Sequence, residues 1–251
     1  MFRVYFILFL LGHILGDFYI QTRKMAESKE KSAKWVLKHC LCYWGMMLLI
    51  SLPIMSCEIA LAATMAATLH LVIDLAKFAY LSSITKKASM TQIKERNVFF
   101  IDQLLHIVCL ATIAYWLVAS NATTNEWKVI KDFFTVVGVS EVSVLSWIFA
   151  LLFIHKPANI MIQKLLMIYK PENNAEDKKN DNNAGRFIGT VERIIMLIFL
   201  SIGQYSAIGL VLTAKSIARY DRISKEKDFA EYYLLGTLIS TVIVIVSSFF
   251  I

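Results

Sequence analysis

Long apolar runs separated by short polar segments make up most of this chain. Each run is about as long as the ~20 residues that a helix needs to cross a bilayer, so we expect a helical span from each. The expected spans cover residues 2–20, 35–55, 59–81, 98–119, 133–169, 186–219 and 232–251. This pattern predicts an all-α fold, a polytopic transmembrane helical bundle of about six to eight membrane segments.

The polar segments divide the chain into three parts. Residues 1–169 predict a transmembrane core, and residues 186–251 predict C-terminal membrane segments packed on that core. Between them, residues 170–185 are rich in Asn, Asp, Glu and Lys, which predicts a flexible loop. The run 186–219 is longer than one span needs and contains two glycines, so we expect a tilted, broken or re-entrant helix there.

Composition supports a membrane protein. The chain is 57% hydrophobic and 18% charged, whereas a soluble domain carries about a quarter charged residues. The net charge of +7 comes from Lys and Arg between the apolar runs, which indicates contacts with membrane lipids and no nucleic acid partner. The four cysteines form no CxxC arrangement, so free thiols are expected.

The distribution of basic residues also predicts the topology. The segment after the first run holds six Lys or Arg residues, the next holds none, and the one after the third run holds four. The positive-inside rule then puts the amino terminus outside and the first and third loops in the cytoplasm. No small-residue cleavage site follows the first run, which we interpret as a retained span. Simple alternation would put Lys215–Lys227 outside, unless segment 186–219 folds back.

Three His/Asp pairs with a spacing of four residues interrupt the apolar runs. They are His13 with Asp17, His70 with Asp74, and Asp102 with His106. A helix places residues four apart on one face, about 5–6 Å apart at Cβ. Because the spans alternate in direction, all three pairs and His39 fall in one leaflet, on the cytoplasmic side. Ionisable groups inside a membrane are costly and usually mark a functional site, so we predict one shared site.

Neutral imidazole and ionised carboxylate are common ligands of Zn, Mn and Fe. The predicted metal ligands are His13, Asp17, His39, His70, Asp74, Asp102 and His106. They provide enough donors for one or two divalent ions, whose identity stays open among the three metals. The mixed nitrogen and oxygen donors disfavour a purely calcium or magnesium site. Some of the aspartates can instead orient a ligand histidine.

A bound metal can activate water and polarise a phosphoryl or acyl oxygen. We therefore predict a metal-dependent, membrane-embedded hydrolase that acts on a lipid or lipid-phosphate-like substrate near the cytoplasmic leaflet. The predicted catalytic residues are Asp17, Asp74, Asp102 and Lys77. Lys77, together with Arg23 and Lys24, is also expected to hold an anionic head group.

Other interpretations stay open. A cation or proton transporter or channel would use the same buried cluster, and a bis-histidine haem protein is disfavoured by the adjacent aspartates and the absence of CxxCH. The pairs can also be interhelical ion pairs that stabilise the bundle. Lys77 can extend to the interface, Arg23 and Lys24 can be topology anchors, and His39 can be interfacial. His155 is more typical of a packing residue.

Two sets of residues also resemble a known family. The first set is His13, Asp17, Phe18, Gln21, Met25, Ala26, Lys29, His39, His70, Ile73, Asp74, Lys77, Asp102, Gln103 and His106. The second set is Gly185, Arg186, Ile188, Gly189, Glu192, Arg193, Ala214, Lys215, Ser216, Ala218 and Arg219. With these residues the chain resembles a bacterial membrane family of unknown function, domain of unknown function 3307. The resemblance implies a polytopic bacterial protein without an established activity, and we expect a multi-pass protein of the cytoplasmic (inner) membrane. A looser likeness to membrane-bound metal-dependent hydrolases rests on His and Asp usage alone.

Overall fold

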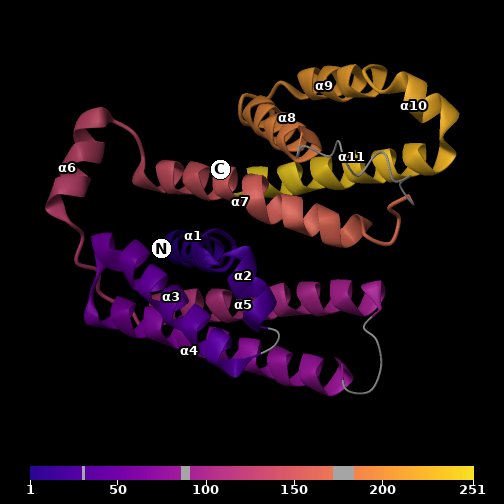
Figure 1. Cartoon of the computed structure of the whole chain (residues 1–251). Coiled ribbons are helices and arrows are strands. Elements are labelled where there is room, and N and C mark those ends of the chain that lie inside the picture. Colours follow the sequence, from indigo (N-terminus) through magenta and orange to yellow (C-terminus); the bar gives the residue numbers. More distant parts are fainter. Residues whose placement is uncertain (30–31, 86–90, 172–183) are drawn as a thin grey trace. The chain divides into compact units, whose positions relative to one another are not determined.

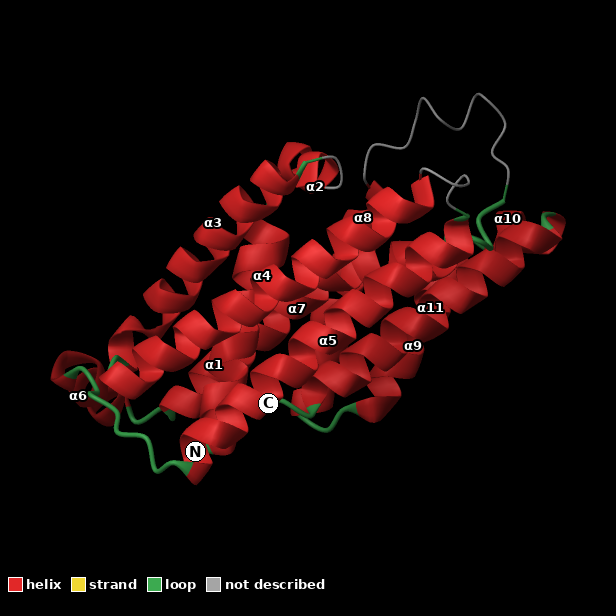
Figure 2. Ribbon diagram, turned by 90° about the horizontal axis from the view of Figure 1, so that it is seen from below, coloured by secondary structure: helices red, strands yellow, loops and turns green. Residues whose placement is uncertain are grey.

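The described part of the chain is helical throughout. The computed structural model describes residues 1–29, 32–85, 91–171 and 184–251. It is 86% helix, and no strand occurs among the residues described (Figure 2). The predicted all-α fold is therefore confirmed. Most of the predicted loop at 170–185, and Lys86 and Lys87 of the third predicted loop, lie outside the described residues.

The chain divides into two compact units, Met1–Phe149 and Ala150–Ile251. The first contains α1 (Phe2–Ile14), the π-helix η1 (Leu15–Ile20), α2 (Arg23–Lys29), α3 (Ala33–Ser51), the 3-10 helix η2 (Leu52–Ile54), α4 (Cys57–Thr85), α5 (Gln92–Ala119) and α6 (Lys128–Val137). The second contains α8 (Ala184–Ser201), α9 (Tyr205–Ile217), α10 (Tyr220–Lys225) and α11 (Lys227–Ser248). The division falls inside α7 (Glu141–Leu166).

In the first unit, α1, α3, α4 and α5 form a four-helix bundle (Figure 1). α1 packs against α3 and α5, and α4 packs against the same two helices. Apolar residues occupy nearly every position of α1, and two-thirds of this span is buried. Phe9 of α1, Met47 of α3 and Leu110 of α5 are among the core side chains. This packing fixes the end of α1 among the three other helices.

The outer faces of this bundle are also apolar. Leu41 of α3, Leu61 of α4 and Leu104 of α5 are each more than half exposed. Large exposed apolar surfaces are unusual for a soluble monomer, whereas lipid tails would cover them in a bilayer.

Six helices in the described part are long and apolar enough to cross a membrane. They are Phe2–Ile20, Ala33–Ile54, Cys57–Ile84, Gln92–Ala119, Glu141–Leu166 and Lys227–Ser248. This number agrees with the predicted six to eight segments and indicates a membrane protein. Lys128–Val137 forms the separate helix α6, which ends at Gly138 in the left-handed conformation, so the fifth span begins only at Glu141.

In the second unit, the predicted segment 186–219 is a broken helix that folds back. α8 ends at Ser201, and α9 begins at Tyr205, with Gly203 between them at a φ of 72°. Lys215 Nζ donates to Glu192 Oε2 at 2.6 Å, so the two arms run side by side in opposite directions. Figure 1 shows the chain continuing through α10 into α11. The fold-back returns Lys215–Lys227 to the side from which α8 starts, which removes the topology conflict.

Arg193 of α8 is buried in the second unit and holds it together. Its guanidinium donates to Ile154 O at 2.8 Å, Asn159 Oδ1 at 2.8 Å, Thr190 Oγ1 at 3.2 Å and Ser240 Oγ at 3.4 Å. Buried charges need such partners. The network ties α7 and α11 to α8.

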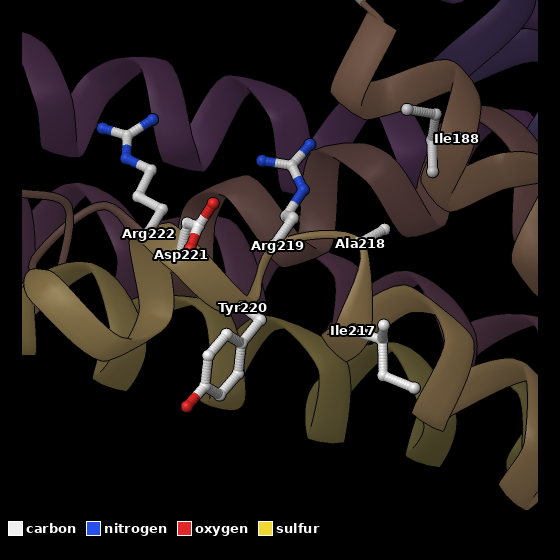
Figure 3. Close-up of a pocket in the computed structure, with 7 residues that line it drawn as sticks. All are labelled: Ile188, Ile217, Ala218, Arg219, Tyr220, Asp221 and Arg222. Atoms are coloured by element: carbon white, nitrogen blue, oxygen red, sulfur yellow. The ribbon is translucent and has the colours of Figure 1, made fainter.

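A cavity of about 860 Å³ opens where α9 meets α10 (Figure 3). Ile188, Ile217, Ala218, Arg219, Tyr220, Asp221 and Arg222 line it. In Figure 3 the guanidinium groups of Arg219 and Arg222 rise on the same side of the ribbon, and the Tyr220 ring points to the other side. Arg222 also donates to Glu226 at 3.1 and 3.2 Å. The residues that line this cavity include two arginines and no histidine.

Candidate metal centre

The structure brings all seven predicted ligands into one cluster in the first unit. They are His13 at the end of α1, Asp17 in η1, His39 in α3, His70 and Asp74 in α4, and Asp102 and His106 in α5. Each is buried, with at most 9% of its surface exposed. The residues far apart in sequence meet because the carboxyl ends of α1 and α4 and the amino ends of α3 and α5 lie at the same end of the bundle.

Four donor atoms converge at the centre of this cluster. His39 Nε2 lies 2.9 Å from Asp17 Oδ1 and 3.1 Å from His70 Nε2. Asp74 Oδ2 lies 3.7 Å from His39 Nε2 and 3.6 Å from His70 Nε2. Ligands held about 2.0–2.1 Å from a first-row metal lie roughly 3.0–3.5 Å from one another. The spacing of these atoms therefore fits a metal ion.

A second group of donors also includes Asp74. Asp74, Asp102 and His106 each offer a ligand atom within 4.8 Å of the others. His106 Nδ1 lies 2.9 Å from the carbonyl oxygen of Asp102, which can only accept, so Nδ1 carries the proton. In the neutral ring His106 Nε2 is then an acceptor, and it has no hydrogen-bond partner among the described residues.

His13 differs from the other histidines because both of its ring nitrogens contact side chains. Gln103 Nε2 donates to Asp17 Oδ2 and to Asp102 Oδ2, each at 3.4 Å. This orients the amide so that Gln103 Oε1 accepts from His13 Nε2 at 3.3 Å. Tyr43 then donates its hydroxyl to His13 Nδ1 at 3.3 Å. In this arrangement His13 lies beside the converging donors and helps to orient Gln103.

Two lysines neutralise part of the cluster. Lys29 Nζ lies 3.1 Å from Asp74 Oδ2, and Lys77 Nζ lies 2.8 Å from Asp102 Oδ2. Burial lowers the pKa of Lys29, but the carboxylates of Asp17 and Asp74 outweigh this, and the pKa is raised. Lys29 is therefore charged at neutral pH. Three carboxylates against two ammonium groups leave one excess negative charge when the histidines are neutral.

The local backbone of η1 helps to position Asp17. π-helical turns are rare and occur often at functional sites, and this one contains both Gly16 and Asp17. A Cβ atom on Gly16 would lie 2.6 Å from the Tyr43 ring. The missing side chain lets Tyr43 stack on His70, with ring centroids 3.8 Å apart and planes within 5°. Tyr43 thereby supports two histidines at once.

Several other predicted residues do not join this cluster. Arg23 pairs with Glu27 on the exposed face of α2, and Lys24 is exposed. His155 lies in α7 within the second unit, where Glu192, Arg193, Lys215 and Arg219 are also found. Lys77 does join the cluster, through Asp102.

The predicted ligand set omitted Lys29, Tyr43 and Gln103. Lys29 lies in a polar segment that resembles an ordinary surface loop, and Tyr43 lies in an apolar run where an aromatic residue is unremarkable in sequence. Gln103 directly follows Asp102, and an amide inside an apolar run was a usable signal. All three reach the cluster from different helices.

A family described as "Protein of unknown function (DUF3307)" matches residues 5–134. The chain belongs to this family. The matched region contains every residue of the cluster and ends before the second unit begins. No curated protein and no solved structure matches the chain. The family description names no activity, so function has to be argued from the site.

Proposed function

We propose that this protein is a metal-dependent hydrolase embedded in the bacterial cytoplasmic (inner) membrane, acting on a lipid or lipid-phosphate substrate. The divalent ion, Zn, Mn or Fe, is held by Asp17, His39 and His70, with Asp74 as a further ligand. One observation carries the proposal: His39 Nε2, His70 Nε2 and Asp17 Oδ1 converge within 3.5 Å of one another from three different helical elements.

The depth of the cluster suits a substrate with its head group at the membrane surface. Asp17 is 15 residues from Phe2, and Asp102 is 17 residues from Ala119. At 1.5 Å per residue these distances are roughly 22–26 Å. The hydrocarbon core is about 30 Å thick, so the cluster lies just inside one of its two boundaries. The positive-inside rule assigns that boundary to the cytoplasmic leaflet.

The residues around the ion have separate roles in this proposal. A bound metal ion lowers the pKa of water and neutralises charge on the group under attack. With a single ion bound, Asp102 Oδ1 would accept a proton from water, while Lys77 holds Asp102 Oδ2 at 2.8 Å. Lys29 and Lys77 supply the positive charge that an anionic head group needs. In this proposal His13, whose ring nitrogens both contact side chains, and Gln103 orient the carboxylates around the ion.

One observation favours a second candidate, a cation or proton transporter. A series of buried and half-buried polar contacts runs from Lys77 through Asp102, Gln103 and Asp17 to His39 and His70. Such a series can relay protons. The close convergence of His39 Nε2, His70 Nε2 and Asp17 Oδ1 suits a resident ion better than an ion in transit, which is why hydrolysis is the first proposal.

Two measurements on wild type and His70→Ala separate the candidates. The hydrolase predicts cleavage of a phospholipid or prenyl-phosphate panel in detergent micelles, where no gradient exists, and its loss in His70→Ala. The transporter predicts metal or proton flux in sealed proteoliposomes without turnover in micelles. His155→Ala is the matched control because His155 lies outside the cluster. Flux without turnover contradicts the hydrolase.

A further inference from the structure

We propose that the cluster holds a second divalent cation beside the first, bound by Asp74, Asp102 and His106, and that the substrate is therefore a phosphate ester. This inference rests on the proposed function and narrows its substrate class. Asp74, which has one carboxylate oxygen in each set of donors, would be a ligand of both ions.

Three buried polar atoms carry the argument. Asp74 Oδ1, Asp102 Oδ1 and His106 Nε2 have no hydrogen-bond partner among the described residues. The three residues are 3%, 5% and 2% exposed, so bulk water does not reach them freely. Leaving a buried polar atom unpaired costs about 1–3 kcal/mol, and more for a charged group. These atoms come from the same three residues whose ligand atoms lie within 4.8 Å of one another.

The lysines leave one oxygen of each carboxylate available to a cation. Lys29 Nζ donates a hydrogen bond to Asp74 Oδ2, and Lys77 Nζ donates one to Asp102 Oδ2. In each carboxylate one oxygen therefore has an ammonium partner, while the other has none among the described residues. His106 has its proton fixed on Nδ1 by the carbonyl of Asp102, which leaves the lone pair on Nε2 for a metal.

The two sets of donors are close enough for a paired centre. Asp74 Oδ2 belongs to the first set, and its other oxygen belongs to the second. The rings of His70 and His106, one from each set, have centroids 4.3 Å apart. Two-metal hydrolytic centres hold their ions about 3.5–4 Å apart.

The charge of such a centre selects the substrate. The cluster has one excess negative charge, so two divalent ions would leave an excess of three positive charges. A phosphate monoester and a hydroxide offset this excess, whereas a neutral acyl ester does not. In the reaction, the water oxygen forms a new bond to phosphorus and the bond from phosphorus to the lipid oxygen breaks. One proton of that water goes to the departing lipid oxygen, giving an alcohol and inorganic phosphate.

Manganese titration of the full-length protein in detergent tests this inference. Stripped protein is dialysed against Mn²⁺, and the bound metal per chain is counted and examined by electron paramagnetic resonance. We expect two Mn²⁺ per wild-type chain with a spin-coupled spectrum. His106→Ala and the milder His106→Gln should each retain one ion with an uncoupled signal. His155→Ala should retain two, and size-exclusion elution checks the folding of every variant.

The possible outcomes separate this inference from the proposed function. One ion in wild type, lost in His39→Ala and kept in His106→Ala, overturns the second site and leaves the proposed function standing. No bound ion in folded wild type overturns both. Two uncoupled ions, or two ions that survive in His106→Gln, also overturn the inference. The substrate class is tested separately by assaying cleavage of phosphate esters and of acyl esters. Cleavage of acyl esters alone contradicts the inference that the substrate is a phosphate ester.

Discussion

The Nε2 atoms of His39 and His70 lie 3.1 Å apart, although the residues belong to different helices. His39 Nε2 is also 2.9 Å from Asp17 Oδ1. Two neutral imidazoles can share one proton at this distance, and two protonated ones would repel. A metal ion satisfies both nitrogen lone pairs and the carboxylate together, which is the reason for the proposed centre.

Metal removal should destabilise the protein. A ligand present at 100 times its Kd stabilises the folded state by about 2.7 kcal/mol. We expect a chelator to lower the melting temperature of the wild type in detergent and Zn²⁺ or Mn²⁺ to restore it. Asp17→Asn should respond clearly less than wild type to both additions, because it weakens the first ion only, while Asp132→Asn, on the exposed surface of α6, should behave as wild type. An equal chelator response in Asp17→Asn and wild type contradicts the assignment.

Gly16→Ala should disturb the centre through Tyr43. The added Cβ would lie 2.6 Å from a rigid aromatic ring, so the ring has to move away from His70. Overpacking of this kind costs about 1–3 kcal/mol, and we expect weaker metal binding as well. Gly45→Ala is the control, because nothing lies within 4 Å of its new Cβ in the middle of α3. Helix propensity predicts that this control gains about 0.5–1 kcal/mol.

Tyr43→Phe tests the separation between ligands and supporting residues. The change removes the hydroxyl group that donates a hydrogen bond to His13 Nδ1. It keeps the aromatic ring that stacks on His70. We expect a loss of about 1–3 kcal/mol from the unpaired nitrogen, with the metal retained. Thermal melting and elemental analysis measure the two effects. Loss of the metal in a folded Tyr43→Phe protein would place His13 or Tyr43 among the ligands.

Lys29→Met should destabilise the first unit in a pH-dependent way. It leaves Asp74 without its ammonium partner, and breaking a buried pair costs about 3–5 kcal/mol. Because the folded-state pKa of Lys29 is raised, its stabilisation is complete below the ordinary value of 10.5 and is lost as pH rises through the higher folded value. The difference in melting temperature between wild type and variant should stay constant from about pH 6 to 10 and shrink only above 10.5, as the pH rises through the raised folded-state pKa. Lys24→Met, at an exposed position, should show no such difference.

Arg193→Met should destabilise the second unit without changing the metal content. Arg193 donates to groups on three helices of that unit, and its loss leaves several of them unpaired. We expect a loss of about 3 kcal/mol or more, since the network is buried. Melting followed by elemental analysis checks both parts. A folded Arg193→Met protein that has lost its metal would contradict the assignment of the centre to the first unit.

Much of the fold and the members of the cluster were predictable from sequence. The length of each apolar run was enough to predict the membrane spans. The four-residue spacing within each His/Asp pair, such as His70 and Asp74, was enough to predict that both members lie on one face of a helix. Alternation of the spans then put the pairs at one depth. These predictions use only the geometry within a helix and the thickness of a bilayer.

The contacts between helices were not predictable in the same way. Whether Gln103 or Asp102 faces Asp17 depends on the rotation of α5 about its axis, which is set by side-chain packing along the whole bundle. The entry of Lys29 into the cluster depends on how α2 folds back after η1. The break at Gly203 was one of three open alternatives, and the pair between Glu192 and Lys215 decides it.

Elemental analysis of the purified protein, with His70→Ala and His155→Ala beside it, tests the central claim most directly. The account predicts stoichiometric Zn, Mn or Fe in wild type and in His155→Ala, and a loss of at least one metal ion per chain in His70→Ala. Folded wild-type protein without stoichiometric metal, or an undiminished metal content in folded His70→Ala, contradicts the proposed centre.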